Sequence, residues 1–326
     1  MFSLNAEKQS ETQANFVDNK LSQQVQTIVD EVGKALLGKD HQIRLALCCL
    51  FSGGHLLIED LPGMGKTTLS YALAKALGLG YNRIQFTSDL LPADILGISI
   101  FDQNTSQFTF HPGPIFNQLV LADEINRTTP KTQSALLEAM EERQVTIEGE
   151  TRILPEPFFV IATQNPVTLA GTYPLPESQL DRFLMRLRLG YPDQQAERKL
   201  LEMSTEKDKV EDIRQCLSVK DVIQFRKQSS EVKASGPLLD YVLRLINFTR
   251  GKDDFHFGLS PRGSLAIMRS AKTWALMCGR NHVVPEDVQV ILPWVVEHRL
   301  RATLDDDGHT GASLVQRLLN EVDVID

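Results

Sequence analysis

Short apolar runs that end in polar or acidic residues recur along residues 21–190 of this chain. Such runs, rich in Leu, Ile, Val and Phe and bounded by Gly, Pro or charged residues, are typical of buried strands. Segments with apolar residues at helical spacing separate them. This alternation predicts an α/β fold, with a mostly parallel five-stranded sheet between two layers of helices. The predicted strands cover approximately residues 55–59, 83–87, 119–123, 158–162 and 184–189.

From about residue 195 onward, the strand-like runs give way to helical periodicity. Ser260-Pro261 predicts the start of one helix, because Pro suits the first helical position, and Gly279 predicts its end. Pro285 predicts the start of a further helix, in which Pro293 should cause a break or a kink. The second part of the chain is therefore expected to be a helical lid domain.

Composition supports a chain that can bury a sizeable core, because 42% of its 326 residues are hydrophobic. The longest apolar run is far shorter than the roughly 20 residues needed to span a bilayer, so no membrane insertion is expected. The first residues lack the basic and apolar regions of a secretory signal, which predicts a cytoplasmic protein. The predicted parts are a flexible tail over residues 1–20, an α/β core over 21–192 and an all-α lid over 193–326.

Two pairs of alternating apolar and polar segments predict β-hairpins that interrupt the core. Residues 98–101 and 107–110 flank a turn-rich centre. Residues 145–148 and 151–154 flank Gly149-Glu150. Either hairpin could instead be a simple decoration of the sheet edge. The first carries the aromatic residues Phe108 and Phe110, which makes it the preferred candidate for substrate contact.

The most informative segment, Glu59–Thr68, reads EDLPGMGKTT and lies between a predicted strand and a predicted helix. Its glycines allow backbone N–H groups to curl around phosphate oxygens, and the helix N-terminus adds partial positive charge. In such a phosphate-binding loop the lysine reaches the β- and γ-phosphates, and the following hydroxyl binds Mg²⁺. The alternative is an ordinary Gly-rich turn. The predicted ATP-binding residues are Pro62, Gly63, Met64, Gly65, Lys66, Thr67 and Thr68.

One position departs from the usual phosphate-loop pattern. The pattern G-x-x-x-x-G-K-[ST] has glycine five residues before the second glycine, and this chain has Asp60 there. The substitution leaves the strength of nucleotide binding open.

An apolar run that ends in two acids, Leu119–Glu124, predicts the metal side of the same site. Asp123 is expected to hold Mg²⁺ together with Thr67, and Glu124 to polarise the water that attacks the γ-phosphate. A third run ends at Asn165, whose amide could hydrogen-bond both the γ-phosphate and that water. Taken alone, the acidic pair could be a solvated loop, and Asn165-Pro166 could be an ordinary turn.

Together these segments resemble the MoxR family of AAA+ ATPases, in the branch with an insertion in helix 2. The matching segments follow the family's order from about residue 36 to residue 300. They are residues 57–68, 110–116, 121–127, 133–142, 162–166, 175–183 and 259–262.

The resemblance implies roles for three residues near the γ-phosphate. Asn165 matches the sensor 1 position. Arg182 matches the arginine finger that enters a neighbouring subunit's site, although an ion pair with Asp181 or another nearby acid is the alternative. Arg262 matches the sensor 2 position at the start of a lid helix, where an anionic partner would suit the helix dipole. The resemblance leaves open which subunit's nucleotide Arg262 contacts.

The resemblance also implies hexameric rings and a partner protein, often one with a von Willebrand factor A domain. The leading interpretation is an ATP-hydrolysing chaperone that remodels or matures such a partner, or assists insertion of a metal cofactor. An ATPase subunit of a metal-chelatase-like complex is the closest alternative. A nucleotide-dependent scaffold with little turnover is another, and Asp60 is the feature that favours it.

The net charge, the cysteines and the histidines argue against several other classes of protein. The net charge of −8 argues against nucleic acid as the main partner and makes a DNA motor the weakest alternative. The four cysteines and seven histidines have no metal-ligand spacing, so we expect structural cysteines and assign no histidine to catalysis.

Overall fold

The computed structural model describes residues 20–104, 106–165, 172–202, 210–251, 255–302 and 311–325. The spatial contacts between residues divide the chain into two compact units. One unit comprises residues 31–223, and the other comprises residues 1–30 together with 224–326. The predicted tail lies outside the described residues except for Lys20. The sequence-based boundary at residue 192 remains a prediction, since the first unit extends further along the chain.

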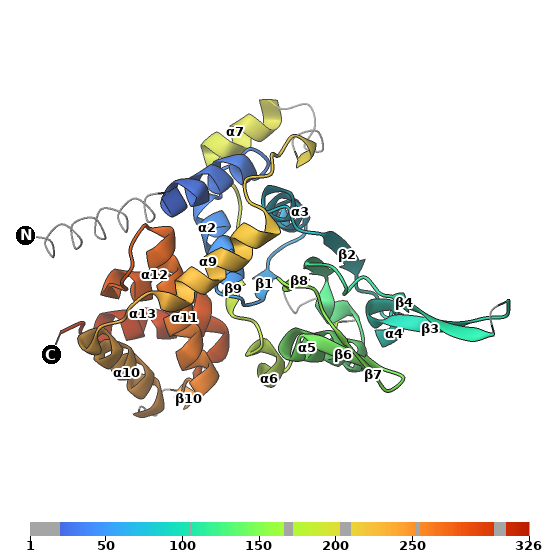
Figure 1. The fold of residues 1–326 in the computed structure, drawn as a ribbon. Helices are drawn as coiled ribbons and strands as arrows, with labels where there is room; N and C mark the ends of the chain where they lie inside the picture. The colour runs from blue at the N-terminus through green and yellow to red at the C-terminus, as the bar shows by residue number, and fades with distance from the viewer. Residues whose placement is uncertain are drawn as a thin grey trace, which may run out of the picture. The chain divides into compact units, whose positions relative to one another are not determined.

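The first unit contains a five-stranded parallel sheet with strand order β2-β5-β8-β1-β9. Figure 1 labels β1, β2, β8 and β9 of this sheet. The predicted sheet is therefore confirmed. Because all five strands run in the same direction, their carboxyl ends meet at one edge. The strands are β1 (Leu56–Glu59), β2 (Tyr81–Gln85), β5 (Leu119–Asp123), β8 (Phe159–Gln164) and β9 (Met185–Leu187).

Helices connect these strands, as a parallel sheet requires. A proline occupies the start of both α4 and α5, and Thr129 is the N-cap of α5. Between the strands lie α3 (Lys66–Ala76), α4 (Pro92–Leu96), the 3₁₀ turn η1 (Ile125–Arg127), α5 (Pro130–Glu142) and α6 (Glu177–Leu180). A helical segment over residues 20–33 and α2 (Asp40–Phe51) come before β1, and α7 (Gln194–Glu202) and α9 (Val219–Glu231) come after β9. The 20–33 segment and α9 each cross a boundary between the two units.

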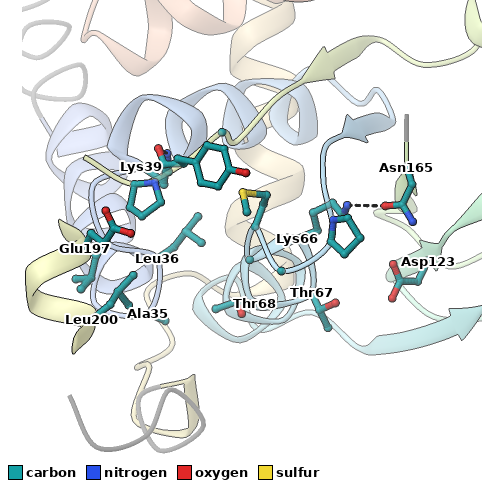
Figure 2. Close-up of a pocket in the computed structure, with 18 of the residues that line it drawn as sticks. Ala35, Leu36, Lys39, Lys66, Thr67, Thr68, Asp123, Asn165, Glu197 and Leu200 are labelled. Atoms are coloured by element: carbon teal, nitrogen blue, oxygen red, sulfur yellow. Dashed lines mark hydrogen bonds between the residues drawn. The ribbon is translucent and has the colours of Figure 1, made fainter. Parts of the chain in front are cut away.

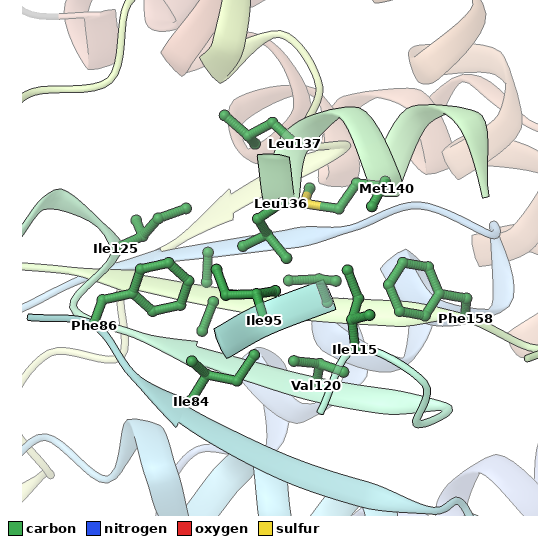
Figure 3. Close-up of a cluster of buried hydrophobic side chains, with 14 of the residues drawn as sticks. Ile84, Phe86, Ile95, Ile115, Val120, Ile125, Leu136, Leu137, Met140 and Phe158 are labelled. Atoms are coloured by element: carbon green, nitrogen blue, oxygen red, sulfur yellow. The ribbon is translucent and has the colours of Figure 1, made fainter. Parts of the chain in front are cut away.

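The core of this unit forms where α5 and α4 pack against one face of the sheet (Figure 3). Alternate strand residues such as Val120 and Ala122 of β5 point into it, because successive strand side chains face opposite sides. Leu136 and Met140 of α5 lie one turn apart and cover them. The apolar face of α5 is therefore part of the core.

Two antiparallel hairpins interrupt the α/β order, as expected. The first joins β3 (Gly97–Asp102) to β4 (Gln107–Pro112) and follows α4. The second joins β6 (Gln144–Ile147) to β7 (Glu150–Ile153). Its turn is Glu148-Gly149 rather than the predicted Gly149-Glu150. Both turn residues have positive φ, 53° and 83°, which is the requirement of the two-residue turn that suits the strand twist.

The second unit is mainly helical, which confirms the predicted lid. Ser260 caps α11 by accepting a hydrogen bond from the Gly263 N–H over 3.1 Å. The helix containing Pro293 continues to Val296 and is followed by a 3₁₀ turn, so the predicted break at the proline does not occur. A short strand pair was not predicted. The elements are α10 (Gly236–Gly251), β10 (Phe255–Phe257), α11 (Pro261–Met277), α12 (Pro285–Val296), η2 (Glu297–Arg299), β11 (Arg301–Ala302) and α13 (Gly311–Glu321).

None of the helices that the structure describes has the length and apolarity to cross a lipid bilayer. None of the four cysteines forms a disulfide, and Cys48 and Cys49 are buried in α2. Within the described residues, no cluster of His, Cys, Asp and Glu is arranged to hold a metal ion. Burial of Cys48 and Cys49 agrees with a structural role for these two, whereas Cys278 is exposed.

Candidate nucleotide site

The loop between β1 and α3 has the backbone of a phosphate cradle. Gly63 and Gly65 have φ of 83° and 85°, a region that L side chains rarely adopt. Gly65 is the N-cap of α3 and offers no capping side chain, so the first N–H groups of the helix lack a side-chain acceptor there. Open space surrounds the position of a Cβ at Gly63. Helix dipole and free N–H groups together favour an anion in this loop.

The ammonium group of Lys66 is held at the mouth of this loop. It donates to the backbone oxygens of Asp60 over 2.6 Å and of Leu61 over 3.0 Å. It also donates to the side-chain oxygen of Asn165 over 3.2 Å. Burial lowers the pKa of Lys66 from its ordinary value, while three nearby carboxylates act in the opposite direction. The lysine is thus a buried cation whose contacts are mostly neutral oxygens, which suits it to a phosphate.

Asp60, the departure from the loop pattern, has a structural role. Its Oδ2 accepts hydrogen bonds from the backbone N–H groups of Leu189 and Gly190, both over 2.7 Å. Its Oδ1 accepts from the N–H of Leu61 over 2.9 Å. The carboxylate therefore ties the start of the loop to the chain that follows β9, and it faces the backbone rather than occupying the phosphate cradle.

Asp123 ends strand β5, and the residue is only 7% exposed. Its Oδ1 accepts from the Thr163 hydroxyl over 2.6 Å, and its Oδ2 accepts from Arg83 Nη2 over 2.7 Å. Arg83 lies on the neighbouring strand β2 and is half exposed. Neither Thr163 nor Arg83 was identified from the sequence, because each contacts Asp123 across strands about 40 residues apart in the chain.

The next residue, Glu124, adopts a left-handed backbone with φ of 59°, which is uncommon for a residue other than glycine. The Thr163 hydroxyl accepts from its backbone N–H over 2.8 Å and stabilises that conformation. Its Oε1 accepts from the Asn165 amide over 2.8 Å. Its Oε2 accepts from Arg127 over 2.7 Å and from Gln85 over 3.1 Å. The carboxylate is therefore oriented by three donors.

Lys66, Asp123, Glu124 and Asn165 line one cavity of about 580 Å³. Figure 2 shows Lys66 bonded to Asn165, with Thr67 and Asp123 beside them and Leu36, Lys39 and Leu200 across the space. Every residue of the predicted phosphate loop from Pro62 to Thr68 contributes to its wall, as do Asp123, Glu124 and Asn165. The sequence reasoning missed the opposite wall: Ala35, Leu36, Leu37, Lys39, Gly190, Tyr191, Pro192, Glu197 and Leu200.

The opposite wall is fixed by a buried lysine. Lys39 is 7% exposed, and its ammonium donates to the backbone oxygen of Tyr191 over 2.6 Å. This bond joins the start of α2 to the chain leading into α7. The cavity therefore has a polar phosphate end and a partly apolar far end, the arrangement needed for a nucleotide.

Arg182, one of the two predicted arginines, is not part of the cavity wall. Its Nη1 donates to the Leu137 backbone oxygen over 2.8 Å and forms an ion pair with Glu141 over 2.9 Å. Arg262 is exposed in the first turn of α11, in the other unit, so its position relative to the cavity is not defined.

Two family models match the chain. The model for the ATPase family associated with various cellular activities (AAA) matches residues 55–185, and the AAA lid domain matches residues 247–318. The first match contains the phosphate loop, the acidic strand end and Arg182. The second contains α11 and most of the helical unit.

Similar proteins extend over most of the chain. Chaperone MoxR1 of Mycobacterium tuberculosis is 41% identical over 84% of this chain and 75% of its own length. Protein MoxR of Methylorubrum extorquens is 30% identical over 83% and 85%. The uncharacterized protein YeaC of Bacillus subtilis is 43% identical over 91% and 93%.

A solved structure agrees with the fold. The crystal structure of a candidate ATPase from Cytophaga hutchinsonii has a TM-score of 0.85 and 35% identity, covering 97% of this chain and 98% of that one. A phosphate cradle, an oriented acidic pair and a helical lid are thus found in a chain with close MoxR relatives. The chain belongs to the MoxR family of AAA ATPases, enzymes that bind and hydrolyse ATP.

Proposed function

We propose that this ATPase is a chaperone that uses ATP hydrolysis to remodel or mature a partner protein. The observation that carries the proposal is the chain of contacts from Lys66 through Asn165 to Glu124, which joins the phosphate lysine to the acid that would polarise water. Because Asn165 would contact the γ-phosphate and also holds Glu124, it can couple phosphate binding to the orientation of the acid. The 41% identity to a protein named Chaperone MoxR1 supports the use of that coupling on proteins.

In the proposed site, Pro62, Gly63, Met64, Gly65, Lys66, Thr67 and Thr68 bind the phosphates of ATP. Glu124 polarises the attacking water, and Asn165 contacts both that water and the γ-phosphate. Since the Glu124 carboxylate is already held by oriented donors, little reorganisation is needed at the moment of reaction.

The residues present also fit a magnesium ion bound with the nucleotide. Thr67 and Asp123 both line the cavity and offer the oxygen ligands that Mg²⁺ prefers. When bound, the ion would neutralise charge on the phosphate oxygens. Asp123 would have to share its Oδ2 between the ion and Arg83, which already donates to it.

AAA ATPases typically form oligomers, and for this chain we propose a hexameric ring. In it, Arg182 would reach the γ-phosphate of a neighbouring subunit and stabilise charge in the transition state, an effect worth roughly 10³–10⁵ in rate in related hydrolases. Support comes from the position of Arg182 outside the cavity of its own chain. Arg262, at the N-terminus of α11, would bind phosphate as the lid closes.

The proposed partner is a protein with a von Willebrand factor A domain, with insertion of a metal cofactor as one possible outcome of remodelling. The scaffold alternative loses its main support, because Asp60 has a structural partner in the backbone after β9. A chelatase-like complex would share the same ATPase site and differ in its partner.

The test uses a variant that binds ATP but cannot release its partner. Glu124→Gln is expected to retain a specific protein from a cell extract with ATP and to lose it with ADP, while Lys66→Ala retains none in either state. Metal analysis of the retained protein distinguishes simple remodelling from cofactor insertion. Retention that ignores the nucleotide, together with negligible turnover of the unmodified protein, would contradict the proposal and support a scaffold.

A further inference from the structure

The guanidinium of Arg182 is anchored to the C-terminal half of α5. Its Nη1 makes both contacts, to the Leu137 backbone oxygen over 2.8 Å and to the Glu141 carboxylate over 2.9 Å. Leu137 and Glu141 are four residues apart and therefore lie on one face of the helix. Neither contact uses Nη2, the second terminal nitrogen of the arginine.

The backbone that carries Arg182 is fixed to the same helix. Phe183 is fully buried, and Leu180 packs against the core that contains Leu137. The short helix α6 before it also contacts α5, because Gln179 Nε2 donates to the Ser134 hydroxyl over 3.4 Å. With its backbone anchored, the remaining freedom of Arg182 is in its long side chain, which has many rotamers.

The ion pair contributes little to stability. The two side chains are 30% and 33% exposed, and ion pairs that solvent can reach contribute little to stability because water and salt screen their attraction. Moreover, Glu141 lies in the last turn of α5, where the helix dipole disfavours an acid. The helix dipole therefore does not explain the carboxylate at this position, and the carboxylate does hold Arg182.

We propose that Glu141 is a positioning residue for Arg182, fixing its guanidinium so that the free end can meet the γ-phosphate of a neighbouring subunit. This inference rests on the proposed role of Arg182 as an arginine finger. A finger held in one geometry before the neighbour binds ATP loses less conformational freedom on reaching the transition state. Removal of Glu141 should then lower the rate at the neighbouring site and leave the chain's own site intact.

The experiment mixes two inactive variants. Glu124→Gln subunits have a defective site but an intact finger, and Arg182→Ala subunits have an intact site but no finger. If the finger acts between subunits, the mixture recovers ATPase activity that neither variant has alone. Glu141→Ala is then added either to the finger donor, the Glu124→Gln chain, or to the Arg182→Ala chain.

We expect Glu141→Ala in the finger donor to lower the recovered kcat about tenfold, with little change in KM for ATP. The same change in the Arg182→Ala chain should have no effect, because that chain has no finger to position. Glu141→Gln in the donor should restore most of the loss, since its amide oxygen can still accept from the arginine. Glu142→Ala, at the exposed next position, is the matched control and should leave the rate unchanged.

Each outcome bears on a separate claim. If Glu141→Ala lowers the recovered kcat equally in either chain, Glu141 acts on its own site or on folding. If it lowers the recovered kcat in neither chain, Glu141 does not position the arginine. Both results overturn the inference while leaving the finger in place. A parental mixture that recovers no activity would instead overturn the role of Arg182, and the inference with it.

Discussion

Asn165 and Glu124 are joined by a hydrogen bond of 2.8 Å between the amide Nδ2 of the first and the carboxylate Oε1 of the second. The amide oxygen of Asn165 accepts from Lys66 at the same time. A single side chain therefore links the cation that would bind the γ-phosphate to the acid that would polarise water. Loss or gain of the phosphate at one end can change the orientation of the acid at the other.

Replacement of Asn165 by alanine removes both ends of this link. We expect kcat for ATP hydrolysis to fall about 10²-fold, the typical effect of deleting one oriented donor, while ATP binding changes little. Phosphate release measures kcat, and equilibrium binding of a fluorescent ATP analogue measures affinity. Unchanged turnover would show that Asn165 has no part in the reaction.

The Thr163 hydroxyl also positions the acidic pair, since it contacts both Asp123 and Glu124. It donates to Asp123 and accepts from the backbone N–H of Glu124. Thr163→Val has nearly the same shape but loses both bonds, so we expect about 2 kcal/mol of destabilisation and about a tenfold loss of kcat. Thr163→Ser retains the hydroxyl and should keep most of the stability and most of kcat. Urea unfolding and steady-state kinetics on the pair test this, and equal behaviour of the two variants would contradict it.

Asp60 should matter for folding more than for nucleotide binding. Asp60→Gly restores the usual phosphate-loop pattern but leaves the N–H groups of Leu189 and Gly190 without their acceptor. We expect a loss of about 3 kcal/mol in the free energy of unfolding, measured by chemical denaturation, and no gain in ATP affinity. Tighter ATP binding by this variant would mean that Asp60 limits the nucleotide site itself.

The far wall of the cavity should affect ATP binding and not the rate of hydrolysis. Lys39→Met removes the bond to the Tyr191 backbone and loosens the wall that faces the phosphate loop. We expect KM for ATP to rise about tenfold with kcat nearly unchanged, the signature of lost uniform binding. The control is Lys34→Met, whose lysine lies on the surface and pairs with Glu31. A fall in kcat for Lys39→Met would indicate a more direct catalytic effect.

The sheet and its motifs could be predicted because their signals are local. A buried strand that ends in polar residues, such as Leu119–Asp123, is visible as a run of letters, and parallel strands bring such ends together. Lys66, Asp123, Glu124 and Asn165 were named on this basis, and all four line one cavity. The hairpin turn at Glu148-Gly149 was misplaced by one residue, because either Gly149 neighbour could complete a turn.

Contacts between distant segments left no comparable signal. Thr163 lies near the end of the strand β8, where nothing in the local sequence marks it as functional. The pairing of β5 with β8 brings it to Asp123. Lys39 and Tyr191 are 152 positions apart, and Arg182 reaches Glu141 across a gap of 41 (182 − 141). Such partners are determined by tertiary packing, which periodicity and motif spacing do not encode.

The central claim is that the chain is an ATPase whose sites are completed by a neighbouring subunit. Steady-state ATP hydrolysis over a range of protein concentrations, for the unmodified chain and for Glu124→Gln and Arg182→Ala, tests it most directly. The account predicts a specific rate that rises with concentration and falls by at least about 10²-fold in both variants. A rate that is independent of concentration and indifferent to Arg182→Ala would contradict it.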